Sequence, residues 1–112
     1  MPLFREEVFG SIAPVMSVED DNEAIRLANS TGYGLAAAIQ TPSMHRAQSI
    51  ADQLKTGIVH INDQPVIHSV YGPIGGMGAS GNGGRTGRPA WEHEFTQMRW
   101  QTMNERSPDY PF

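Results

Sequence analysis

The sequence predicts an α/β fold built around a parallel-sheet unit in the order strand, helix, strand, helix, strand. Two stretches carry apolar residues at the spacing typical of amphipathic helices, and three short apolar runs alternate with them. Residues that start or stop helices stand at the boundaries between these stretches. Such alternation favours parallel strands joined by right-handed helical crossovers.

The first strand is expected over residues 12–18, between Gly10 and an acidic cluster at 19–21. The first helix follows, with Asp20 as its N-terminal cap and Glu23 as the capping-box partner three residues later. Its apolar stripe consists of Ala24, Leu27 and Ala28. Residues 29–34 end the helix because Asn and Gly tolerate the left-handed conformation. The apolar run at 35–39 then predicts a strand covered on both faces.

The second helix has the clearest periodicity in the chain. Ser43 is placed to cap it, and Gly57 is expected to stop it. Ala47 is followed by apolar residues three, four and seven positions later, at Ile50, Ala51 and Leu54. Residues 58–61 then predict the third strand, since they are mostly β-branched.

The last third of the chain is rich in glycine. Eight of the twelve glycines lie between Gly72 and Gly87, so this loop is expected to be ordered by packing or hardly at all. Thr86 is expected to cap a short helix with Pro89 in its first turn. Polar and apolar residues alternate over 96–103, which predicts a half-exposed strand, and 104–112 is expected to be a loose tail.

Composition restricts the function classes. The net charge of −4 argues against nucleic acid or an anionic membrane as a partner. The apolar runs are too short to cross a bilayer and the first residues lack a signal-peptide layout, so we expect a cytoplasmic protein. The four histidines show no metal-ligand spacing, and we expect no metal. The absence of cysteine excludes disulfides and a cysteine nucleophile within this chain.

Several ordered motifs resemble the C-terminal part of the NAD(P)-dependent aldehyde dehydrogenase superfamily. The chain opens with E-E-V-F-G at 6–10. It continues with E-A-I-R-L-A-N at 23–29, Y-G-L-A-A at 33–37, G-I-V-H-I-N at 57–62 and G-G-M-G-A-S-G at 75–81. The resemblance covers residues 1–103. The N-D-Q-P and G-A-S-G-N-G stretches are most similar to the benzaldehyde and vanillin dehydrogenase type.

The resemblance implies a cofactor subsite for NAD or NADP at the start of the chain. It places Glu7 on the nicotinamide ribose hydroxyls and Phe9 beside the nicotinamide ring. A carboxylate accepts two hydrogen bonds from a diol, and an aromatic face limits how a flat ring sits. Ser11 stands where the family usually has proline. Taken by itself, the short motif is also compatible with an acidic tail and a core phenylalanine.

The resemblance also implies that residues 62–73 form a loop lining the aldehyde entrance, which ends beside the catalytic thiol. Ile74 replaces an aromatic ring of the family, so the wall stays apolar but changes shape. His68 either contacts an oxygenated aromatic substrate or lies solvated on the loop. The candidate pocket residues are Gln64, Ile67, His68, Val70, Tyr71 and Ile74.

By resemblance, residues 1–95 correspond to the C-terminal portion of the catalytic domain, 96–103 to an oligomerisation strand and 104–112 to a tail. The family uses a cysteine thiolate, a general-base glutamate and a dinucleotide-binding domain, all upstream of this region. We therefore expect a piece of an aldehyde dehydrogenase, from a truncated reading frame or an excised segment, with no catalytic residue of its own. The alternative is a noncatalytic assembly module that forms homo-oligomers through its C-terminal strand.

Overall fold

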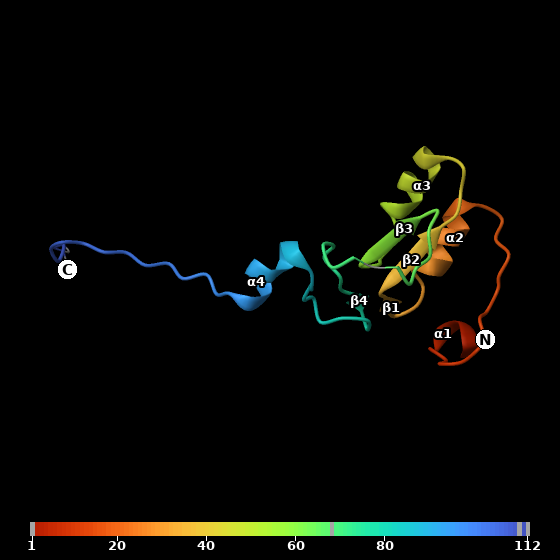
Figure 1. Ribbon diagram of the computed structural model, residues 1–112, viewed down its shortest axis with the longest axis horizontal. Helices are drawn as coiled ribbons and strands as arrows, with labels where there is room; N and C mark the ends of the chain where they lie inside the picture. Colours follow the sequence, from red (N-terminus) through yellow and green to blue (C-terminus); the bar gives the residue numbers. More distant parts are fainter. Residues whose placement is uncertain (1, 68, 110, 112) are drawn as a thin grey trace.

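The computed structural model describes residues 2–67, 69–109 and 111 as a mixed α/β chain (Figure 1). The helices are α1 (Pro2–Arg5), α2 (Asp21–Ala28), α3 (Met44–Ala51) and α4 (Trp91–Phe95), with a short 3₁₀ turn at Arg88–Ala90 before α4. The strands are β1 (Tyr33–Gly34), β2 (Ala36–Ile39), β3 (Ile58–Ile61) and β4 (Met77–Gly78).

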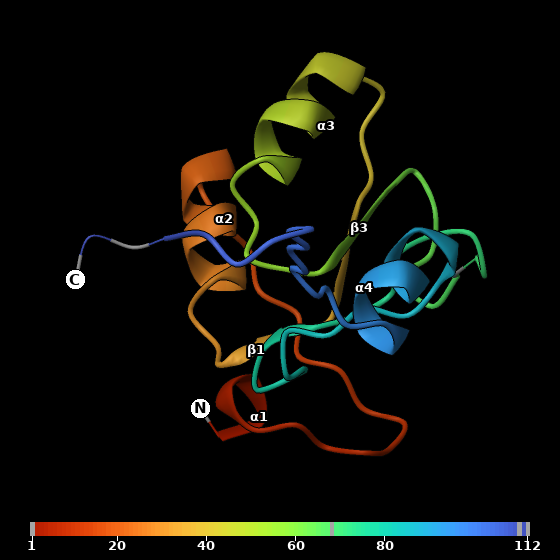
Figure 2. The ribbon, with the colours of Figure 1, turned by 90° about the vertical axis from the view of Figure 1, so that its left-hand side faces the viewer.

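The centre of the fold is the parallel pair β2 and β3. Their register runs from Ala36 opposite Ile58 to Ile39 opposite Ile61, and α3 lies between them in sequence. This confirms the predicted parallel pairing of these two strands. The helices α2 and α3 lie on the same side of the pair (Figure 2). A bidentate ion pair between Arg46 and Asp21 joins the two helices.

Both long helices begin where the sequence predicts. The Asp20 carboxylate accepts a hydrogen bond from the Glu23 amide at 2.8 Å, and the Ser43 hydroxyl accepts one from the Arg46 amide at 3.2 Å. The Glu23 carboxylate reaches one residue further back than a capping box requires and accepts from the Glu19 amide. Both helices therefore start at a residue whose side chain satisfies a free backbone N–H.

The ends of the helices differ from the prediction. Asn29 follows α2 with φ −83°, which is not left-handed, and α3 ends several residues before Gly57. The Asn29 amide instead donates to the Gln53 carbonyl and accepts from the Lys55 amide, both at 2.8 Å. This side chain ties the end of α2 to the segment after α3, a long-range role that local sequence does not reveal.

Two predicted strands are wrong. Residues 12–18 are all exposed, and the described residues provide no hydrogen bond to them. Residues 96–103 also lack strand pairing, with Met98 97% and Trp100 91% exposed. The physical reason is the same in both places. A strand requires a neighbour for its N–H and C=O groups, and alternating side chains cannot supply one.

The glycine-rich loop is ordered by pairing. β4 pairs antiparallel with β1, and Ile74 and Thr86 form an isolated antiparallel bridge. Thr86 is therefore not a helix cap as predicted, and Gly87, with φ 106°, precedes the 3₁₀ turn instead. A positive φ at this position favours glycine because it has no Cβ.

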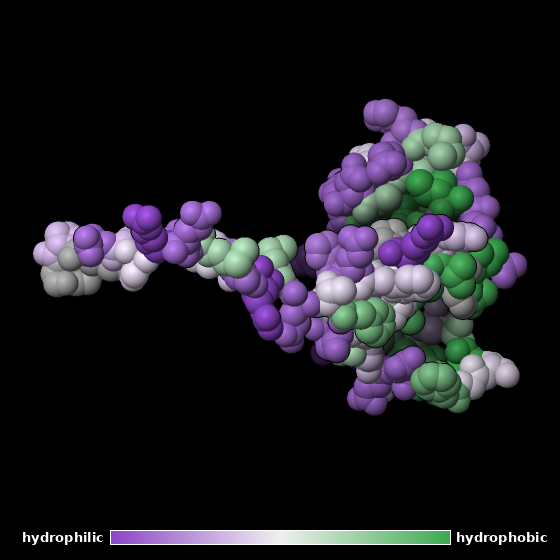
Figure 3. Space-filling view, turned by 60° about the vertical axis from the view of Figure 1, so that its left-hand side comes forward, coloured by the Kyte–Doolittle hydropathy of each residue, from purple (hydrophilic) through white to green (hydrophobic). Residues whose placement is uncertain are grey.

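The described chain exposes far more surface than a compact protein of its size. Its accessible surface is 9660 Å², whereas a folded monomer of this mass exposes about 6,100 Å². Its radius of gyration is 21.2 Å, against about 13 Å for a compact domain of this length. The chain therefore buries a little under half of its unfolded surface, whereas a compact domain of this length buries about two-thirds. Figure 3 shows apolar patches and a hollow on the globular part, and a thin C-terminal extension.

Candidate functional site

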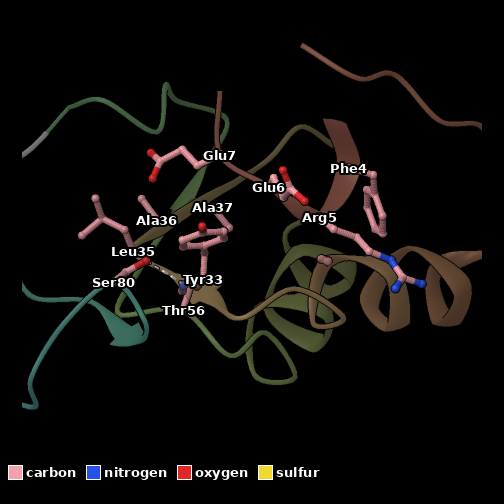
Figure 4. Close-up of a pocket in the computed structure, with 12 residues that line it drawn as sticks. Phe4, Arg5, Glu6, Glu7, Tyr33, Leu35, Ala36, Ala37, Thr56 and Ser80 are labelled. Carbon is pink, nitrogen blue, oxygen red and sulfur yellow. Dashed lines mark hydrogen bonds between the residues drawn. The ribbon is translucent and has the colours of Figure 1, made fainter. Parts of the chain in front are cut away.

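A cavity of about 410 Å³ lies between the N-terminal segment and the β1–β2 region (Figure 4). Glu7, Tyr33 and Ser80 surround one part of it, and Phe4 and Arg5 lie at the other end. The wall therefore combines carboxylate, hydroxyl and aromatic groups with apolar strand residues. Such a mixed lining suits a ligand with both a flat ring and hydroxyl groups.

The structure separates the two predicted cofactor residues. Glu7 lines the 410 Å³ cavity. Phe9 is 95% exposed and is not part of that lining. Glu6 also lines the cavity, although the sequence prediction left it without a role.

A second cavity of about 330 Å³ lies between β3 and the loop predicted to line the aldehyde entrance. It brings together two of the predicted pocket residues, Ile67 and Ile74. The other predicted residues in the described part of the loop, Gln64, Val70 and Tyr71, are exposed and do not line it. His68 lies outside the described residues.

The same cavity contains a residue that sequence reasoning missed. His60 of β3 lines it, and the Nε2 atom of His60 is buried without a hydrogen-bond partner among the described residues. A buried polar atom without a partner costs free energy. Only the position of His60 within an apolar strand could have drawn attention to it.

Asn62 directs the chain from β3 into the entrance loop. It has φ 56°, the left-handed conformation, and its Oδ1 accepts a hydrogen bond from the Thr41 amide at 2.8 Å. Thr41 is buried. Asparagine is among the few residues that adopt this conformation readily, so the identity of this residue helps to set the direction of the loop.

The glycine turn at 75–76 is held against the strands. A Cβ on Gly57 would lie 1.7 Å from the Gly75 carbonyl oxygen, so the two backbones touch. The Arg85 guanidinium donates to the Gly76 carbonyl at 3.1 Å. The Ser80 hydroxyl accepts from the Gly34 amide at 3.1 Å. These contacts fix the turn relative to β1 and β3.

Among the described residues, the ion pair whose pKa values are shifted is that of Asp21 with Arg46, and it lies away from both cavities. Hydrogen bonding to Arg46, with a smaller contribution from its charge, lowers the pKa of Asp21 below its ordinary value. The same pairing raises the pKa of Arg46. Within the described part of the chain, no group of three or more His, Asp or Glu side chains is arranged to hold a metal ion.

The comparison with protein families decides the family. The aldehyde dehydrogenase family model matches residues 1–101. The chain belongs to the aldehyde dehydrogenase family. The resemblance seen in the sequence motifs is therefore confirmed.

Similar proteins include enzymes that act on aromatic aldehydes. The chain is 50% identical over 112 residues to a benzaldehyde dehydrogenase [NAD(+)] of Pseudomonas putida, covering 100% of this chain and 23% of that protein. It is 42% identical over 113 residues to a vanillin dehydrogenase of an Amycolatopsis species, again covering 100% and 23%. This aldehyde dehydrogenase chain thus spans about a quarter of the length of these relatives.

The fold also matches a solved structure, that of a salicylaldehyde dehydrogenase from Pseudomonas putida G7 complexed with salicylaldehyde. The TM-score is 0.90 at 35% identity, and the match covers 97% of this chain and 22% of that chain. The extended segments of the aldehyde dehydrogenase chain are part of this match. Among its described helices, none combines the length and apolar character needed to cross a membrane.

Proposed function

We propose that this chain provides the nicotinamide-facing and aldehyde-facing walls of an enzyme that oxidises an aromatic aldehyde to the carboxylic acid with NAD or NADP. The observation that carries the proposal is the identity of 50% over the whole chain to a benzaldehyde dehydrogenase. The two cavities support it, because they lie on the strands β1 to β3 and contain residues that the family resemblance assigns to cofactor and substrate.

In the proposed enzyme, Glu7 accepts hydrogen bonds from the ribose diol of the cofactor. It already lines the larger cavity, so its carboxylate needs no large movement to reach a ligand there. Phe9 restrains the nicotinamide ring. Because Phe9 is 95% exposed in this chain, its ring is available to a cofactor held by the rest of the enzyme.

The aldehyde side of the proposed enzyme is formed by the entrance loop. Ile67 and Ile74 make an apolar wall around the 330 Å³ cavity, which favours an aromatic ring over a charged aldehyde. The loop also carries the exposed side chains of Gln64, Val70 and Tyr71, together with His68. We assign Gln64, Val70 and Tyr71 to the outer part of the entrance.

The chemical step needs a thiolate to attack the aldehyde before hydride leaves for the cofactor. The chain has no cysteine, and a hydroxyl does not substitute, because it is far less ionised near neutral pH. The nucleophile and general base must come from residues outside these 112. We therefore expect no turnover from this polypeptide alone.

The test is a chimera in which this sequence replaces the matching segment of the Pseudomonas putida benzaldehyde dehydrogenase. We expect NADH formation with benzaldehyde, and none from the isolated chain. Glu7→Gln should raise the KM for NAD+ by roughly tenfold or more, as for loss of a charged hydrogen bond. The matched control Glu19→Gln should change it by less than about threefold, since Glu19 is exposed and does not line the 410 Å³ cavity. An inactive, folded chimera, or equal effects of both variants, would contradict the proposal.

A second role is favoured by the exposed C-terminal extension. We assign residues 96–103 to subunit association, because their alternating side chains are exposed and their backbone lacks a strand partner in the described chain. Deleting these residues from the chimera should lower its oligomeric state in light scattering. An unchanged assembly would rule the assignment out.

A further inference from the structure

The loop that connects β4 with the 3₁₀ turn before α4 carries an asparagine in a distinctive chemical setting (Figure 1). Of the five asparagines in the chain, only Asn82 is followed by glycine. Both Asn82 and Gly83 are exposed, and a Cβ on Gly83 would meet no atom within 4 Å. Because glycine has no Cβ, the backbone nitrogen of Gly83 is unhindered beside the Asn82 side-chain amide.

The backbone holds the Asn82 amide in a defined place. Its Oδ1 accepts a hydrogen bond from the Gly84 amide at 3.0 Å, so the side chain spans the Gly83 peptide. A donor on a carbonyl oxygen draws electron density from the carbonyl carbon, which makes Cγ of Asn82 more electrophilic. The Asn29 and Asn62 side chains, by contrast, bond to distant backbone groups and precede residues that have a Cβ.

We propose that Asn82 is a deamidation site, at which the side-chain amide is converted to a carboxylate through a cyclic imide. The Gly83 nitrogen gives its proton to a base from the solvent and attacks Cγ of Asn82. The bond from Cγ to Nδ2 then breaks, and Nδ2 leaves as ammonia after taking up a proton. Water opens the imide ring at either carbonyl, which gives aspartate or isoaspartate at position 82. No group is oxidised or reduced, and the co-reactant is water.

The new carboxylate would lie beside an existing one. The Asn82 Oδ1 and Glu94 Oε2 atoms lie 3.1 and 3.0 Å from the same point, the position of a Cβ on Gly84. Glu94 also accepts a hydrogen bond from the Arg85 amide at 2.9 Å. The Arg85 guanidinium is turned to the Gly76 carbonyl, 3.1 Å away. Repulsion between the two carboxylates therefore acts directly on the contact that holds the Arg85 backbone.

The residue after Arg85 holds one wall of the cavity assigned to the aldehyde. Thr86 exchanges two backbone hydrogen bonds with Ile74, at 2.7 and 2.8 Å. Ile74 lines the 330 Å³ cavity and also a cavity of about 380 Å³ whose lining includes Asn82 and Glu94. Deamidation is therefore expected to loosen the wall formed by Ile74. The modification is independent of the proposed function, since none of its steps requires a substrate or cofactor.

The first test is peptide mapping by mass spectrometry after incubation of the purified chain in a mildly alkaline buffer. We expect aspartate and isoaspartate at position 82 before any other asparagine is converted. Asn82→Gln is the matched control, because its longer side chain must close a larger ring. It should react at least about tenfold more slowly, which corresponds to about 1.4 kcal/mol in the barrier. An unmodified position 82, earlier conversion of Asn29, or equal rates for parent and variant would overturn the site.

A second measurement tests the consequence for the cavity wall. Asn82→Asp keeps an acceptor oxygen and adds a charge. Hydrogen exchange of the Ile74 and Thr86 amides should become about two- to fivefold faster, the effect of one exposed charge pair. In a Glu94→Gln background, which keeps the acceptor oxygen without its charge, the same substitution should leave these rates unchanged. Equal acceleration in both backgrounds, or none in either, would overturn the link between the deamidation site and the wall.

Discussion

Replacing Gly57 by alanine tests whether close backbone contact holds the glycine turn against β3. The new Cβ would lie 1.7 Å from the Gly75 carbonyl oxygen and 2.8 Å from its carbon. Ordinary van der Waals contact begins at 3.4 Å, so the turn must move away from the strand. Both colliding atoms belong to the backbone, and no side-chain rotation relieves the clash.

The expected loss of stability follows from two opposing effects. Overpacking costs about 1–3 kcal/mol, and the reduced freedom of the unfolded chain returns about 0.4–1 kcal/mol. We expect a net loss of roughly 1–2 kcal/mol, measured by urea unfolding followed by far-UV circular dichroism. In the chimera, displacement of the turn should also lower kcat.

Gly32→Ala is the matched control. A Cβ at Gly32 meets no atom within 4 Å, so this variant should be neutral or slightly more stable. If Gly57→Ala unfolds at the same urea concentration as the control, the contact between the turn and β3 does not hold the structure together.

Three further predictions concern tertiary links. Asp21→Asn should remove the ion pair with Arg46. Because folding lowers the pKa of Asp21, the pair stabilises the fold above the ordinary pKa of 3.8, and this stabilisation is lost as the pH falls through the lower pKa of the folded state. The free energies of unfolding of the variant and the parent should therefore become equal in strong acid. Asn29→Ala should lower the free energy of unfolding by about 1–3 kcal/mol, since two backbone groups beyond α3 lose their partner. Asn62→Ala should cost about 1–2 kcal/mol more than Asn62→Gly, because both lose the bond to Thr41 but only alanine resists φ 56°.

Each of these predictions has a distinguishing outcome. A stability difference for the Asp21 variant that stays constant into strong acid would exclude the ion pair as its cause. Asn22→Ala serves as the control for the Asn29 variant, because Asn22 is exposed on α2 and its side chain makes no hydrogen bond among those of the described residues. Equal unfolding free energies for the alanine and glycine variants of Asn62 would show that backbone conformation is not limiting there.

Local sequence signals predicted the elements whose stabilising contacts are themselves local. The caps Asp20 and Ser43 lie three residues from the amides that they satisfy, so α2 and α3 begin as expected. The apolar runs that became β2 and β3 are separated by one helix, and their pairing was likewise predicted correctly.

The errors in the fold concern segments whose partners are distant. Residues 12–18 and 96–103 have strand-like patterns, yet pattern alone specifies no neighbouring strand. In the candidate site, motif resemblance identified Glu7, Ile67 and Ile74, which line cavities. It did not identify His60, because a single histidine in a strand carries no periodic or spacing signal.

The unit formed by β2, α3 and β3 has a consequence for the order in which the chain acquires structure. The connection between its strands, residues 40–57, is short, so the entropy lost on closing this loop is modest. Ala47, at 0% exposure, lies at the middle of that connection. The unit can thus form early and independently of both chain ends. Its amides should be the last to exchange with solvent, giving the chain a preformed nucleus onto which its other segments condense.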